Sequence, residues 1–77
     1  MSPGIKKIYL ESIGILKQRK NFERIDLQFV RDYATGRYMF ESVPLKPTDS
    51  EIIKGIHDFV NELAITLNLP EIQPKNI

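Results

Sequence analysis

Apolar residues recur at helical spacing in the C-terminal half of the chain. They lie one, four, seven, eight, eleven and fifteen positions after Ile52, which is the stripe of a helix with one buried face: Ile52, Ile53, Ile56, Phe59, Val60, Leu63 and Leu67. Thr48 and Glu51 stand at the spacing of a capping box before this stripe, while Asn68 and Pro70 are typical of the positions after a helix. The pattern predicts a helix over residues 49–67, with the stripe buried in the domain's own core.

Between residues 21 and 45 the pattern changes to alternation. Ile25, Leu27 and Phe29 alternate with polar neighbours, and a second apolar stretch follows a segment that contains Asp32 and Gly36. Period two is the spacing of a half-buried strand, and Asp and Gly are favoured in turns. We therefore predict a hairpin with strands at about 22–32 and 37–44.

The first segment allows two interpretations. As a helix it would use Ser2 as its cap and Pro3 as its first residue, and as a strand over about 6–17 it is rich in β-branched residues. We favour the strand, because a two-stranded sheet is marginal by itself. The predicted fold is then α+β, a three-stranded antiparallel β-meander packed on one C-terminal helix. Residues 1–77 would form a single small domain, with 70–77 as a loose C-terminal tail.

Composition narrows the class of protein. The chain of 77 residues has no cysteine, which fits a reducing compartment. The N-terminus lacks the apolar core of a signal peptide, and no apolar run approaches the length of a membrane span. We expect a cytoplasmic protein without a membrane partner. Charge is segregated, with a net +4 over residues 1–24 and −3 over residues 48–77.

Side chains that could support catalysis are scarce. His57 is the only histidine, and neither a second histidine nor a cysteine stands near it at metal-ligand spacing. The four glycines are isolated from one another, so no phosphate-binding loop can be assembled. The sequence predicts no catalytic residue, metal or cofactor, and the chain is expected not to be an enzyme.

Surplus apolar side chains point to a protein partner. The strand predicted over 6–17 would be apolar on both of its faces, and the face turned away from the helix would continue into the hairpin. We expect a non-catalytic binding module that acts through protein contacts, as a homodimer that covers this surface. The predicted interface residues are Tyr9, Ile13, Ile15, Val30 and Met39.

A basic loop supports an alternative, which is nucleic-acid binding. Lys17, Arg19, Lys20 and Arg24 lie within eight residues, with Phe22 among them. Cations can hold phosphates while an aromatic ring stacks on a base. The competing interpretation is a solvated turn whose charge keeps a small domain soluble.

Overall fold

The structure, a computed structural model, describes residues 1–42, 44 and 46–74. These residues form three α-helices, α1 at Pro3–Leu16, α2 at Leu27–Ser42 and α3 at Ser50–Leu67, with short 3-10 helices at Phe22–Arg24 and Pro47–Asp49. No strand occurs in the described part of the chain. The predicted α+β fold with its β-meander is therefore wrong, and the domain is all-helical.

The first segment adopts the helical alternative. The Ser2 hydroxyl accepts a hydrogen bond from the Ile5 N–H at 3.3 Å, and Pro3 is the first residue of α1. Ser12 is buried on the inner side of α1, where its hydroxyl donates to the Ile8 carbonyl at 2.8 Å and so leaves no polar atom unpaired. A strand over 6–17 would need a neighbouring sheet, and residues 27–42 offer none because they are helical.

Helix α2 replaces the predicted hairpin. The Asp26 carboxylate accepts a hydrogen bond from the Gln28 N–H at 2.9 Å, as an N-cap residue does. The residues buried along α2 are spaced as one broad helical face: Val30, Tyr33, Ala34, Gly36 and Phe40. The predicted strands at 22–32 and 37–44 and the turn between them are thus wrong: residues 27–42 form α2, residues 22–24 form a short 3-10 helix, and position 43 lies outside the described residues.

Helix α3 agrees closely with the predicted span of 49–67. Its N-cap is Asp49 and not Thr48, so the expected capping box with Glu51 does not form. Instead, the Asp49 carboxylate accepts from the Lys46 N–H at 3.2 Å in the preceding 3-10 turn. At the other end Asn68 takes the left-handed conformation, with φ of 53°, as predicted.

The last turn of α3 closes as a Schellman motif. The Leu69 N–H donates to the Ala64 carbonyl at 2.8 Å, and the Asn68 N–H donates to the Ile65 carbonyl at 3.2 Å. Leu69 itself is buried. The motif therefore turns the chain back over the helix that it has just left.

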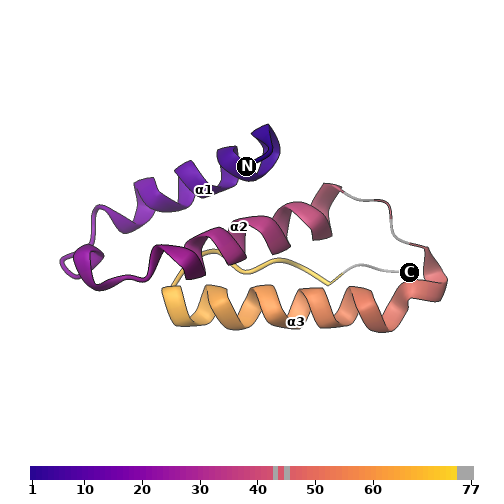
Figure 1. Cartoon of the computed structure of the whole chain (residues 1–77). Coiled ribbons are helices and arrows are strands. Elements are labelled where there is room, and N and C mark those ends of the chain that lie inside the picture. The colour runs from indigo at the N-terminus through magenta and orange to yellow at the C-terminus, as the bar shows by residue number, and fades with distance from the viewer. Residues whose placement is uncertain (43, 45, 75–77) are drawn as a thin grey trace.

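Helix α2 lies in the middle of the molecule, between α1 and α3 and antiparallel to both (Figure 1). Glycine permits a close approach on each side. A Cβ at Gly4 of α1 would collide with the Tyr38 ring, and one at Gly36 would lie 2.6 Å from Val60 Cγ2 of α3. The buried core extends along both contacts and includes residues beyond α3: Leu16, Val30, Tyr33, Phe40, Ile53, Val60, Ala64, Leu67, Leu69 and Ile72.

The C-terminal tail, defined as residues 69–74, is not loose. It runs back between α2 and α3, as the yellow segment of Figure 1 shows. Leu69 and Ile72 are each buried in the core. The prediction of a loose tail is corrected for residues 70–74, and residues 75–77 lie outside the described part of the chain.

Candidate binding surface

An uncovered apolar surface lies on one side of the α2–α3 pair. We call it the α2–α3 face and define it by four large side chains that are 44–61% exposed: Phe29, Met39, Ile52 and Phe59. Ile52 and Phe59 are seven residues apart on α3 and so share one face of that helix. Phe29 and Phe59 line the same groove, which connects the two helices into one surface.

This groove has a volume of about 270 Å³. Phe29 and Phe59 form its walls together with Leu63, while Glu62 and Thr66 complete the lining. The walls are apolar and the two remaining lining residues are polar, which is the layout of an interaction surface with a polar rim.

Gly55 adds to the same side of α3. It stands between Ile52 and Phe59, and a Cβ built there would meet nothing within 4 Å. A glycine in a helix interior costs about 1 kcal/mol relative to alanine. Packing inside the described chain does not offset this cost.

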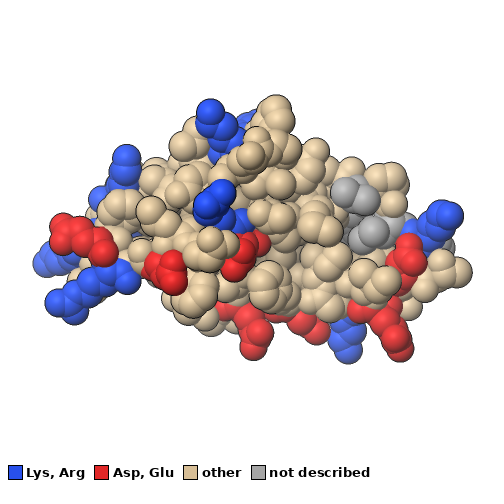
Figure 2. Space-filling model, in the orientation of Figure 1, with Lys and Arg blue, Asp and Glu red and all other residues tan. Residues whose placement is uncertain are grey.

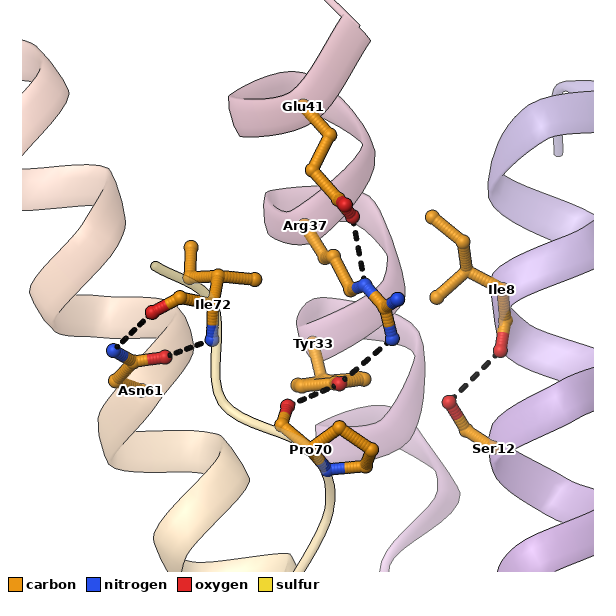
Figure 3. Close-up of polar contacts among 8 residues, drawn as sticks. All are labelled: Ile8, Ser12, Tyr33, Arg37, Glu41, Asn61, Pro70 and Ile72. Carbon is orange, nitrogen blue, oxygen red and sulfur yellow. Dashed lines mark hydrogen bonds and ion pairs between the residues drawn. The ribbon is translucent and has the colours of Figure 1, made fainter. Parts of the chain in front are cut away.

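The opposite side of the α2–α3 pair is covered by the tail, which is held by its backbone (Figure 3). The Asn61 side-chain amide accepts from the Ile72 N–H at 2.8 Å and donates to the Ile72 carbonyl at 3.1 Å. The Tyr33 hydroxyl donates to the Pro70 carbonyl at 2.6 Å. The α3 residue Asn61 and the α2 residue Tyr33 thus fix two backbone positions of the tail.

A polar chain along α2 supports the Tyr33 contact. Arg37 donates to the Tyr33 hydroxyl at 3.1 Å and to the Glu41 carboxylate at 2.7 Å (Figure 3). Burial raises the pKa of Tyr33, against the opposing effect of Arg37. Partial burial disfavours the charged Arg37, but its hydrogen bonds to Glu41 and Tyr33 outweigh this and raise its pKa. Tyr33 is therefore neutral and Arg37 charged at physiological pH.

His57, the only histidine of the chain, lies on the side of the molecule that the tail covers. His57 lies 3.1 Å from the Asp58 carboxylate and 3.1 Å from the Asn61 amide nitrogen, and its ring is tilted against Phe40 with centroids 5.7 Å apart. In the described part of the chain, no three His, Cys, Asp or Glu side chains gather where they could hold a metal ion. The geometry places His57 as a neighbour of Asn61, at the edge of the tail contact.

The predicted interface residues do not come together on one surface. Val30 is fully buried, and Tyr9 and Ile13 are half-buried against the core. Of the five, Ile15 and Met39 are exposed, at 39% and 44%. Met39 belongs to the α2–α3 face, whereas Ile15 lies on α1.

Sequence reasoning missed the other members of the α2–α3 face. Ile52 and Phe59 were expected in the core, and Phe29 was expected inside a hairpin. The available signal was the width of the apolar stripe on α3. Seven large apolar residues exceed what a single neighbouring helix can cover, and in the structure Ile53, Val60 and Leu67 take the buried positions.

The predicted basic loop lies at the end of the molecule where α1 and α2 are joined, and Figure 2 shows lysine and arginine side chains gathered there. Lys17, Lys20 and Arg24 are exposed. Arg19 already makes hydrogen bonds within the chain, because its guanidinium donates to the carbonyls of Leu67 and Asn68 at the end of α3. Phe22, expected to stack on a base, packs against the core.

No family model, curated protein or solved structure matches this chain. Within the described residues, none of the helices combines the length and the apolar character that crossing a membrane requires.

Proposed function

We propose that this chain is a non-catalytic binding module that acts through protein contacts, as a homodimer in which two copies of the α2–α3 face pack together. The observation that carries the proposal is the exposure of Phe29, Met39, Ile52 and Phe59 on one side of two adjacent helices. Large contiguous apolar surface is uncommon on monomers and is typical of interaction sites.

A second copy is the occupant that we propose for this surface. Two antiparallel helix pairs that face each other with apolar stripes form a four-helix bundle, and a two-fold axis brings the same patch of each copy together. A stable interface buries about 800 Å² on each partner. The whole molecule, α1 included, measures 42 × 24 Å along its two longer axes, so an interface of this size would occupy most of one broad side.

Charge favours an antiparallel dimer. The exposed cations Lys17, Lys20 and Arg24 lie at the end where α3 finishes, and Asp49 and Glu51 lie where α3 begins. A parallel arrangement would bring the cations of both copies together. An antiparallel one places them over the acidic start of the partner's α3, which lowers the repulsion.

The test is a matched pair of charged substitutions on α3. Phe59→Asp places a carboxylate on the α2–α3 face, whereas Ile65→Asp places it on an apolar side chain that is more exposed but lies on another side of the helix. We expect Phe59→Asp to weaken dimerisation at least ~100-fold, the size of a hot-spot loss, and Ile65→Asp to leave it unchanged, as measured by sedimentation equilibrium. Equal effects of the two substitutions, or a wild-type monomer at tens of micromolar, would overturn the proposal.

Nucleic-acid binding is the second candidate, favoured by the exposure of Lys17, Lys20 and Arg24 at one end. Each phosphate contact should contribute about 0.9 to the negative salt slope on duplex DNA. Lys17→Ala with Lys20→Ala leaves the structural Arg19 in place and should reduce both affinity and slope. Binding that the double variant does not alter would remove this candidate. For either function we keep the expectation of a cytoplasmic protein, which cell fractionation tests.

A further inference from the structure

The side of the molecule opposite the proposed dimer surface carries a segment bound as a peptide would be bound. Asn61 and Phe59 are two residues apart on α3, so their side chains point to different sides of that helix. The tail follows a sharp left-handed turn at Asn68 and then lies in the seam between α2 and α3 without helical structure of its own. It therefore contacts the helices as a separate strip of chain.

The contacts with this strip follow a simple rule. At Pro70 and Ile72 the helices bind the backbone, through the Tyr33 hydroxyl and the Asn61 amide. Only Leu69 and Ile72 bury their side chains, at 6% and 7% exposure, while the side chains between and after them are exposed. Recognition thus requires two apolar residues three positions apart and a backbone that presents its polar groups to Tyr33 and Asn61.

Asn61 is suited to this task for a chemical reason. A primary amide offers one acceptor and two donors, so it can pair with the N–H and the carbonyl of the same residue. This is the pairing that a neighbouring strand would supply, and it is independent of the bound side chain. Arg37 orients the Tyr33 hydroxyl, whose proton then points to the Pro70 carbonyl.

We propose that the seam lined by Tyr33 and Asn61 is a peptide-binding site that accepts, in place of the chain's own tail, an extended segment of a partner protein. The segment has the pattern of residues 69–74, with an apolar residue, a proline directly after it and a second apolar residue two positions after the proline. The tail is the internal competitor of this partner. Its covalent attachment gives it a local concentration of about a millimolar or more, so the external segment binds well only where the tail has been weakened.

The experiment uses the full chain and a fluorescent peptide with the sequence of residues 69–74. Ile72→Asp weakens the tail by placing a charge in the core contact, and Gln73→Asp, which alters an exposed neighbour, is its control. Fluorescence anisotropy should show the peptide binding to Ile72→Asp at least ~10-fold more tightly than to the wild type or to Gln73→Asp. Adding Asn61→Ala to Ile72→Asp should abolish the gain. A folded Ile72→Asp chain that does not bind the peptide, or binding that ignores Asn61, would overturn the proposal.

A measurement on the wild type keeps the proposal testable if Ile72→Asp does not fold. An external segment can replace the tail only if the tail detaches from the seam while α2 and α3 stay folded. The Ile72 amide should therefore exchange with solvent at least ~10-fold faster than the amides of Val60 and Ala64 in the core of α3. Equal protection of these amides would mean that the tail leaves only on global unfolding, which contradicts the inference.

Discussion

The two sides of the α2–α3 pair are formed by the same helices, but only one of them is covered by another part of the chain. On one side the tail covers the seam, with Ile72 buried and its backbone paired with Asn61. On the other side Phe29 and Phe59 stand about half exposed around an open groove. In this chain the apolar surface is covered on one side only, in keeping with the smaller fraction of surface that short chains bury compared with long ones. The other side stays uncovered while the tail is in place, and it is the side on which we propose that a second copy packs.

Gly36 is the position on which both sides depend, because it sets the distance between α2 and α3. We expect Gly36→Val to push against Val60 and to lower the free energy of unfolding by about 3 kcal/mol, the upper range for overpacking, as measured by urea denaturation at low protein concentration.

The matched control is Gly55→Ala, whose added methyl meets no atom within 4 Å. It should leave the stability of the monomer unchanged or raise it by about 1 kcal/mol. A Gly36→Val chain as stable as the wild type would mean that the two helices are not held as closely as described.

A substitution at Ile72 tests whether the two sides act independently. Ile72→Ala removes a buried side chain from the tail contact and should lower the free energy of unfolding by about 2 kcal/mol. Because the tail does not reach the α2–α3 face, the dimer dissociation constant should stay within about twofold of the wild-type value. Sedimentation equilibrium beside urea denaturation measures both quantities. A large change in dimerisation would show that the two sides are coupled.

A comparison of α3 with α2 also shows why sequence reasoning succeeded in one helix and failed in the other. Helix α3 has one main neighbour, a left-handed residue at its end, Asn68, and a stripe of large apolar residues. The apolar spacing and the end signal therefore both predict the same helix. Helix α2 has neighbours on two sides, and its close contacts use the small residues Ala34 and Gly36. Such a face does not form a stripe of large apolar residues, and a glycine between polar residues resembles a turn.

The candidate site was harder to predict than the fold of α3. Whether Phe59 or Val60 is buried depends on the direction from which α2 approaches, and the sequence of α3 alone contains no information on that direction. The tail contact depends on Asn61 meeting Ile72, eleven residues later, through a turn whose geometry only the folded chain defines.

Tyr33 provides a smaller and pH-dependent test of the covered side. Tyr33→Phe removes the hydroxyl that donates to the Pro70 carbonyl and should lower stability by about 1 kcal/mol near neutral pH. Burial raises the pKa of Tyr33 in the folded chain. Its contribution is therefore complete below the unfolded pKa of about 10 and is lost as pH rises through the higher folded pKa.

The difference in stability between wild type and Tyr33→Phe should accordingly shrink above about pH 10. Denaturant titrations at neutral pH and in this alkaline range measure it. A difference that grows with pH would contradict the assignment of a neutral, hydrogen-bond-donating phenol.

Salt should give the smallest effect, and it acts on the uncovered side. If the cations near Lys17 lie over the acidic start of the partner's α3, raising the salt concentration from about 0.05 to 0.5 M screens exposed charges and should weaken the dimer a few-fold. The apolar contact should persist. Dimerisation that strengthens with salt would instead indicate a parallel arrangement, in which like charges are relieved by screening.

Contact between two α2–α3 faces can be observed directly in a mixture of carbon-13-labelled and unlabelled chains. An isotope-filtered nuclear Overhauser experiment detects only protons of different copies that lie close together. We predict cross-peaks between the rings of Phe29 and Phe59 in one copy and the methyl groups of Ile52, Ile56 and Leu63 in the other, in a species of twice the 8.9 kDa chain mass. A spectrum without such cross-peaks, at concentrations of hundreds of micromolar, would contradict the account.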